Sequence, residues 1–91
     1  MQLLWSAPAR RDLQRLYSFL REVNPRAAKN VLKQLDAAAN RLRSFPQIAP
    51  RLEVYADRDV RALMVGDYEL RYEVKRDALI VVRVWHTREE R

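Results

Sequence analysis

The chain contains a single glycine, Gly66, and its position constrains the fold more than any other residue. Gly66 and Asp67 lie between a mostly apolar run at 60–65 and a segment at 68–75 in which apolar and charged residues alternate strictly. Glycine tolerates the positive φ angle that the first central position of a type II′ turn requires, so this pattern predicts a tight β-hairpin. In the second run, the tyrosine, leucine and valine side chains should share one face, and the charged side chains the other.

A third strand is predicted after a turn at 76–78. The run at 79–85 is rich in β-branched residues and apolar at every position except Arg83, which is typical of a central strand covered on both faces. A buried guanidinium without a partner is costly. Arg83 should therefore either pair with a carboxylate, with Glu73 and Glu69 as candidates, or face a partner molecule.

The N-terminal half predicts a short strand and two helices. Residues 2–5 form a strand too short to stand alone, so it should join the C-terminal strands in one sheet. Ser6 can cap a helix over 7–23, where apolar residues recur at helical spacing. Asn24, followed by proline, repeats this start signal for a second helix that ends before Phe45. The short connection predicts an antiparallel helical hairpin.

The predicted architecture is α+β, in the order β-α-α-β-β-β, with the helical hairpin packed on one face of a small, mostly antiparallel sheet. The segment at 47–59 has no sustained period and should cross the surface from the helices to the sheet. The chain has 91 residues and shows no linker or internal repeat, so a single domain over 1–91 is expected.

The residue inventory excludes several classes of site. With no cysteine and one histidine the chain cannot build a zinc site, and one glycine cannot form a phosphate-binding glycine loop. No apolar run is long enough to span a membrane, and the N-terminus lacks the apolar core of a signal peptide. We therefore expect a cytoplasmic protein that uses no metal or other cofactor.

The net charge of +6 lies entirely in the first half of the chain. Residues 1–45 hold nine Lys and Arg against three Asp and Glu, whereas residues 46–91 hold nine of each sign. An anionic partner is therefore expected. Any nucleic-acid surface on the C-terminal sheet would have to be reconciled with the neutrality of that half.

His86 is the residue best suited to chemistry. It follows the last strand, beside Arg88, and is expected within reach of Arg61 and Arg83 across the sheet. An imidazole near guanidinium groups can act as general acid and base while the arginines hold a phosphate, which is sufficient for RNA cleavage without a metal. The alternative is a strand-end histidine that hydrogen-bonds the tail.

Two motifs and the element order resemble the RelE/ParE superfamily of bacterial toxins from toxin–antitoxin operons. The motifs are Val-Gly-Asp-Tyr-Glu-Leu-Arg-Tyr-Glu-Val at 65–74 and Arg-Val-Trp-His-Thr-Arg-Glu at 83–89, with support from Asp12-Leu13 and from Asn-Pro-Arg-Ala-Ala at 24–28. The resemblance covers essentially the whole chain. It implies one of two activities, because RelE-like members cut mRNA on the ribosome and ParE-like members poison DNA gyrase.

The resemblance favours the ParE side. In RelE-like ribonucleases the residue after the hairpin tyrosine is typically arginine, but here it is Glu69, whose carboxylate would repel a scissile phosphate. The expectation is a toxin that inhibits gyrase without catalytic residues of its own. The alternatives are a ribosome-dependent mRNA endonuclease in which His86, Arg61, Arg83 and Arg88 act, and an inactive member that only binds its antitoxin.

The resemblance also implies a cognate antitoxin, with which the chain would form a hetero-oligomer. Antitoxins of this class contribute an acidic, partly disordered segment, which suits a basic surface. We expect this segment to cover a sheet edge and the basic surface of the two helices. The residues expected to bind it are Arg10, Arg11, Arg21, Lys29 and Lys33.

Overall fold

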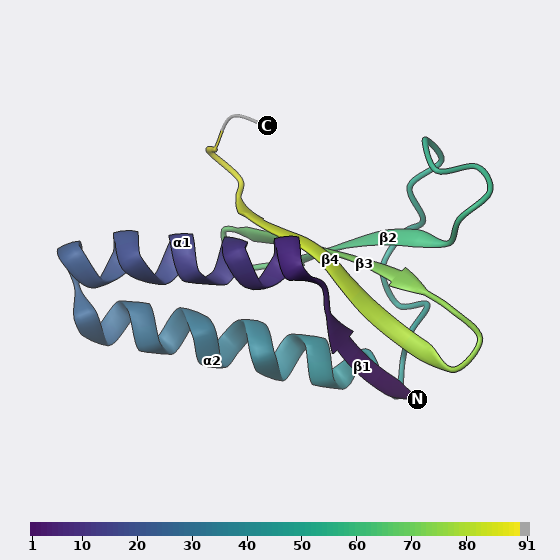
Figure 1. Ribbon diagram of the computed structural model, residues 1–91, viewed down its shortest axis with the longest axis horizontal. Coiled ribbons are helices and arrows are strands. Elements are labelled where there is room, and N and C mark those ends of the chain that lie inside the picture. Colours follow the sequence, from purple (N-terminus) through teal and green to yellow (C-terminus); the bar gives the residue numbers. More distant parts are fainter. Residues whose placement is uncertain (90–91) are drawn as a thin grey trace.

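The computed structural model describes residues 1–89 and has the predicted order of elements. Glu90 and Arg91, at the end of the tail, lie outside the described residues. Figure 1 shows the two helices side by side and antiparallel, with the strands of the sheet crossing next to them. The helices and strands are β1 (Gln2–Trp5), α1 (Ala7–Val23), α2 (Pro25–Arg41), β2 (Val60–Val65), β3 (Tyr68–Val74) and β4 (Ala78–His86).

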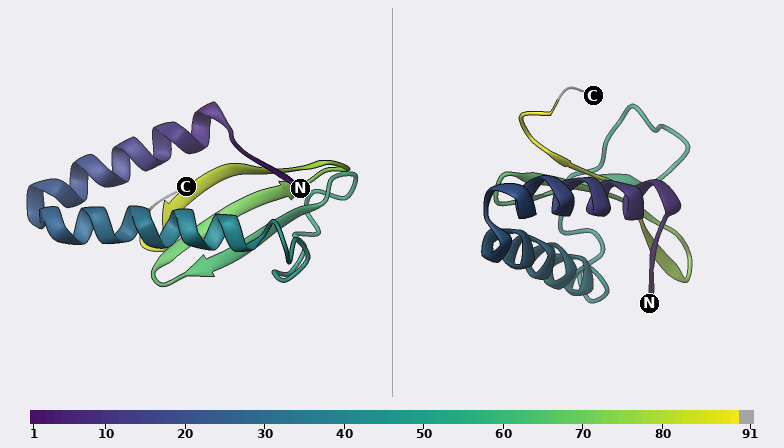
Figure 2. Two further views of the ribbon diagram at one scale, coloured as in Figure 1. Left: turned by 90° about the horizontal axis from the view of Figure 1, so that it is seen from below. Right: turned by 60° about the vertical axis from the view of Figure 1, so that its left-hand side comes forward.

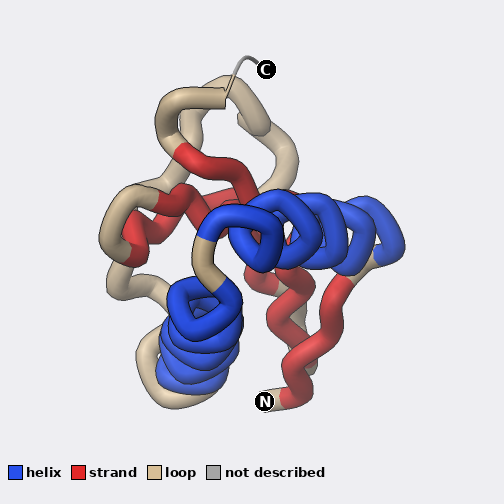
Figure 3. Tube along the Cα trace, turned by 90° about the vertical axis from the view of Figure 1, so that its left-hand side faces the viewer, coloured by secondary structure: helices blue, strands red, loops and turns tan. Residues whose placement is uncertain are grey.

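Both helices begin at the predicted capping residues. The Ser6 hydroxyl accepts a hydrogen bond from the backbone N–H of Ala9 at 3.1 Å. The Asn24 side chain accepts from the N–H groups of Arg26 and Ala27 at 3.1 and 3.2 Å. Only Asn24 separates the helices, which explains the tight connection visible in Figure 3. Within the described chain, no helix is long and apolar enough to cross a membrane.

The sheet has the strand order β1-β4-β3-β2, so β4 is a central strand as predicted. The pairs β2/β3 and β3/β4 are antiparallel, and β1 pairs parallel with β4. Figure 2 shows the strands running obliquely across the helices. The core lies between the sheet and the helices, and its fully buried side chains include Leu35, Leu42, Leu70, Tyr72, Leu79, Val81 and Val84.

The β2–β3 turn has the predicted backbone. Gly66 has a φ of +60°, and no other described residue has a positive φ, so the turn matches type II′, in which only the first central residue needs one. Val65 and Tyr68 pair directly across it. The alternation along β3 is confirmed for its apolar residues, but Glu73, expected to face solvent, is buried because it pairs with Arg58 of the crossing segment.

The outer edge of β4 is only partly covered by β1. Pairing runs from Gln2 with Ala78 to Trp5 with Val81 and then stops. On the other side of β4 the register with β3 shifts after Val81, so that Val82 is an extra, bulged residue. Among residues 1–89, no strand therefore lies on the outer edge of the second half of β4, and α1 lies along that edge instead (Figure 1).

Candidate functional site

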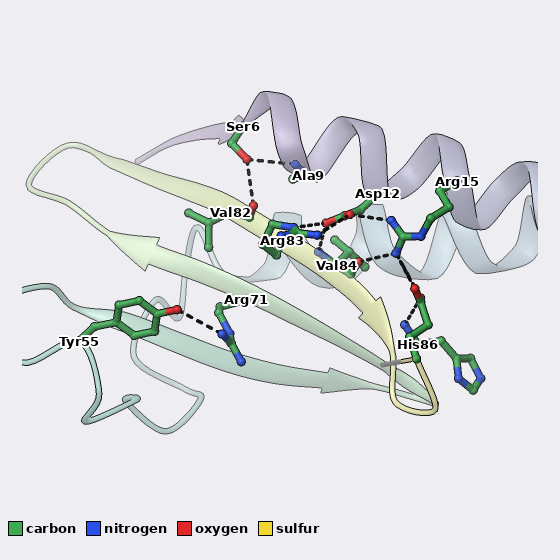
Figure 4. A network of polar contacts seen from close by, with 11 residues as sticks. Ser6, Ala9, Asp12, Arg15, Tyr55, Arg71, Val82, Arg83, Val84 and His86 are labelled. Atoms are coloured by element: carbon green, nitrogen blue, oxygen red, sulfur yellow. Dashed lines mark hydrogen bonds and ion pairs between the residues drawn. The ribbon is translucent and has the colours of Figure 1, made fainter. Parts of the chain in front are cut away.

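Asp12 of α1 is the centre of a polar network at this uncovered edge of β4 (Figure 4). Its side chain is only 3% exposed. It accepts hydrogen bonds from Arg83 Nε at 2.8 Å, Arg83 Nη2 at 3.1 Å and Arg15 Nη1 at 2.7 Å. It also accepts the backbone N–H of Val84 at 2.9 Å. One buried carboxylate thus joins two arginines to a strand edge.

The environment of Asp12 keeps it ionised. Burial alone would raise the pKa of its carboxyl group, but hydrogen bonds from Arg83, from the Val84 N–H and from Arg15 outweigh burial and hold the pKa below its usual value. At neutral pH, Asp12 is therefore a fixed anion, which suits it to hold Arg83 in place rather than to transfer protons.

Other side chains bind the remaining backbone groups along this edge. The Ser6 hydroxyl donates to the Val82 carbonyl at 3.1 Å. Glu89 accepts the backbone N–H of His86 at 2.9 Å and forms an ion pair with Arg15 at 2.9 Å. The chain after β4 is thereby folded back and tied to α1.

Arg83 has a different partner from those predicted. Arg83 pairs with Asp12 on α1, so the prediction that its partner is Glu73 or Glu69 on the neighbouring strand was wrong. Those two carboxylates bind arginines of their own. The reason is geometric, because the bulge and the missing strand beside the second half of β4 let the guanidinium of Arg83 reach the helix.

His86 makes local contacts at the end of β4. Its ring packs edge to face on Tyr68, with the ring centroids 5.1 Å apart. Its Nδ1 atom accepts the backbone N–H of Arg88 at 3.1 Å. These contacts match the expectation of a strand-end histidine that hydrogen-bonds the tail.

Arg61 lies away from His86. Arg61 is opposite Tyr72 in the sheet, whereas His86 is opposite Tyr68, four residues further along β3. At about 3.3 Å per residue, this separation along the strand is about 13 Å. The Arg61 side chain instead donates to Asp59 at 2.9 Å and to backbone carbonyls of the crossing segment.

The residues required for RNA cleavage therefore do not gather in one place. His86 and Arg88 are adjacent, but Arg83 is held by Asp12 and Arg61 by Asp59. Among residues 1–89 there is also no group of three side chains that could hold a metal ion.

The basic residues predicted to bind an antitoxin are all exposed on the helices. Arg21 also lies over the ring of Tyr17, with its guanidinium carbon 5.8 Å from the ring centroid. The role of these five residues stays a prediction. They are Arg10, Arg11, Arg21, Lys29 and Lys33.

A feature that the sequence analysis missed is an apolar groove of about 520 Å³ between α1 and the end of the sheet. Phe19 of α1 is 69% exposed at this groove. A large exposed aromatic next to the apolar stripe of a helix is the signal that could have located it. The lining residues are Arg15, Leu16, Phe19, Leu20, Tyr68, His86, Arg88 and Glu89.

Comparisons with known proteins agree with this fold. A family model described as the ParE toxin of the type II toxin–antitoxin system, parDE, matches residues 3–91. A solved structure of the chromosomal ParDE TA system from P. aeruginosa contains a chain that is similar at a TM-score of 0.79. The two chains are 23% identical, and the match covers 94% of this chain and 95% of the other. No curated protein sequence matches. The chain belongs to the ParE toxin family of type II toxin–antitoxin systems.

Proposed function

We propose that this ParE-family toxin acts by binding and inhibiting DNA gyrase, and that a cognate antitoxin neutralises it. The observation that carries the proposal is the arrangement of the arginines. Arg83 and Arg61 are each held by a carboxylate, and Arg61 lies away from His86, so residues 1–89 show no assembled acid–base site. Inhibition by binding needs a contact surface and no such site.

The apolar groove is the surface best suited to bind a protein target. It combines an exposed aromatic, Phe19, with aliphatic residues of α1 and a charged rim formed by Arg15, Arg88 and Glu89. Protein interfaces typically have an apolar, aromatic-rich centre with a polar rim. The tail at 86–89, tied to α1 through Glu89, forms one wall of the groove.

This assignment is tested by replacing the exposed aromatic. Phe19→Ala should weaken gyrase inhibition by about fivefold or more, since truncating an aromatic anchor at an interface typically costs over 1 kcal/mol. Val23→Ala is the matched control, because Val23 is equally exposed on the same helix but does not line the groove. Equal inhibition by the Phe19 variant and the wild type in a supercoiling assay would remove the groove from the proposal.

Neutralisation is assigned to an acidic antitoxin segment that binds the exposed cations of α1 and α2. Opposite charges raise association rates, and that effect is screened by salt. Replacing Arg10, Arg11 and Arg21 with glutamine should therefore slow association with the antitoxin and flatten its salt dependence in a stopped-flow measurement. An unchanged rate across salt concentrations would place the antitoxin elsewhere on the toxin.

A further inference from the structure

The face of the sheet opposite the core carries a second polar site. A cavity of about 550 Å³ is lined by three arginines from three different segments: Arg58 before β2, Arg71 on β3 and Arg83 on β4. Tyr55 and Trp85 complete its polar and aromatic lining. The Tyr55 hydroxyl is hydrogen-bonded to Arg71 Nη1 at 3.2 Å (Figure 4).

The charges at this site are arranged in layers. Arg58 pairs with Glu73, and Arg83 pairs with Asp12. The carboxylates lie beneath, with side chains 11% and 3% exposed, whereas the two guanidiniums lie above, with side chains 46% and 42% exposed. Arg71 pairs with Glu69, and there too the arginine is the more exposed member, so in all three ion pairs the guanidinium lies nearer to solvent than the carboxylate.

The arginines retain hydrogen-bond donors for a ligand. Arg58 and Arg83 each bind their carboxylate through Nε and Nη2, so Nη1 of both has no hydrogen-bond partner among the described residues. The Nε of Arg71 also lacks a partner in that part of the chain, but this atom is buried and does not offer a donor to a ligand. A guanidinium held on one side by a carboxylate is fixed in orientation, which prepares its other N–H groups for an acceptor.

Two of these cations contact the same aromatic ring. Arg71 and Arg83 lie directly opposite each other across β3 and β4. Their guanidinium carbons are 4.7 and 4.8 Å from the centroid of the same Trp85 ring. Like charges placed opposite each other in a sheet repel, and the electron-rich ring, Glu69 beside Arg71 and Asp12 beside Arg83 each offset part of that repulsion. A bound anion would offset more of it.

The geometry points to a phosphate group. A carboxylate is planar and is recognised through a single two-pronged contact, which each buried acid here already supplies to its arginine. Phosphate oxygens accept hydrogen bonds from several directions at once. This suits a cavity whose arginines come from three different segments of the chain. We propose that this arginine pocket binds phosphate, either as the free ion or as part of a nucleic-acid backbone. This site is separate from the gyrase-binding groove and does not depend on it.

The test monitors the pocket directly in the full-length chain. Trp5→Phe leaves Trp85 as the only tryptophan, so fluorescence reports on the pocket, and NMR of the arginine Nε–H groups reports on Arg71. The probes are inorganic phosphate, a single-stranded oligodeoxythymidylate and a glutamate-rich peptide. Phosphate should shift both signals, and tighter binding of the oligonucleotide would identify a nucleic-acid backbone as the source.

A paired substitution separates this pocket from overall charge. Arg58→Gln together with Glu73→Gln leaves the net charge unchanged, and it should weaken phosphate binding by about tenfold because one of three arginines is lost. Arg26→Gln, exposed at the start of α2, lowers the net charge and should change binding by less than about twofold. If the double variant does not fold, Arg58→Lys is the second test. It keeps the charge but loses the planar donor set, so it should also weaken phosphate binding.

Three results would overturn the proposal. The first is phosphate binding that is unaffected in the Arg58 variants. The second is a set of NMR shifts confined to basic residues of α1 and α2. The third is a pocket whose signals respond to the glutamate-rich peptide but not to phosphate, which would make it a docking site for an acidic protein.

Discussion

The backbone groups on the outer edge of β4 find their hydrogen-bond partners by different means in the two halves of the strand. From Ala78 to Val81 the strand pairs with β1 through backbone hydrogen bonds. From Val82 onward the same edge is bound by side chains, chiefly those of Ser6, Asp12 and Glu89. Both arrangements satisfy buried backbone groups, which would otherwise be costly.

The two arrangements differ in how strongly they depend on particular side chains. Backbone pairing tolerates changes of side chain at exposed positions and does not respond to the ionisation of side chains. The side-chain arrangement depends on the identity and charge of a few residues. The second half of β4, which depends on these side chains, also lies next to the apolar groove and the arginine pocket. It therefore supports both candidate binding surfaces.

The largest effect is expected from Asp12→Ala. Removing one member of a buried ion pair typically costs about 3–5 kcal/mol, and here it also leaves the Val84 N–H without its acceptor. Gln2→Ala, at an exposed site on the β1 side, should change the free energy of unfolding by less than about 0.5 kcal/mol. Urea denaturation of both variants measures the two free energies of unfolding. Similar losses of stability would show that the two halves of β4 do not differ in their dependence on side chains.

A low pH should weaken the side-chain half selectively. The folded-state pKa of Asp12 lies below the ordinary value of 3.8, so its stabilisation is complete above that value and is lost as the pH falls through the folded pKa. Glu89 behaves in the same way, because its bonds to His86 and Arg15 outweigh the effect of burial and lower its pKa from 4.5. We expect the free energy of unfolding to fall below about pH 4.

This loss should be smaller than that in Asp12→Ala, because a protonated carboxyl group can still accept the Val84 N–H. Asp12→Asn should show a shallower decline with pH than the wild type. Some decline should remain, because Glu73 and Glu89 also have lowered pKa values. If the free energy of unfolding fell equally with pH in the wild type and in Asp12→Asn, Asp12 would not be the cause of the acid destabilisation.

Ser6→Ala tests the point where the two halves meet. Ser6 caps α1 and also donates to the Val82 carbonyl. Loss of a capping serine typically costs about 1 kcal/mol, and the second contact should raise this toward about 2 kcal/mol. Ser6→Thr, which keeps the hydroxyl, is the matched control. If thermal unfolding showed that Ser6→Ala lowers the melting temperature no more than Ser6→Thr does, that result would argue against both contacts.

Glu89→Gln should have the smallest effect. The glutamine can still accept the His86 N–H, so mainly the ion pair with Arg15 is lost. Partly exposed ion pairs contribute about 0.2–1 kcal/mol. A double-mutant cycle with Arg15→Gln isolates this coupling, which high salt should reduce. A coupling well above 1 kcal/mol would show that the tail is held more firmly than its exposure suggests.

Sequence signals were sufficient wherever a structure is determined locally. Gly66 fixed the hairpin because the turn needs a positive φ at one position. Ser6 and Asn24 marked both helix starts through side chains that reach two or three residues ahead. The order of the elements followed from these boundaries together with the hydrophobic periods.

The site depended on contacts between distant residues, and there the sequence analysis was less successful. Asp12 was named only as part of the family resemblance and was not predicted to pair with Arg83, although it falls three residues after Ala9 and four before Leu16, on the buried face of α1. A charged residue on that face and an arginine inside an apolar strand could have been paired with each other. The β4 bulge, which changes which side chains reach α1, has no comparable local signal.

We propose that the toxin inhibits gyrase by binding and does not cut RNA. Gyrase supercoiling and cleavage-complex assays with the purified toxin test it directly when run beside programmed ribosomes carrying mRNA. We predict inhibited supercoiling or trapped cleavage complexes, with the mRNA left intact. Codon-positioned mRNA cuts that disappear in His86→Ala, with gyrase unaffected, would contradict the account and make His86 catalytic.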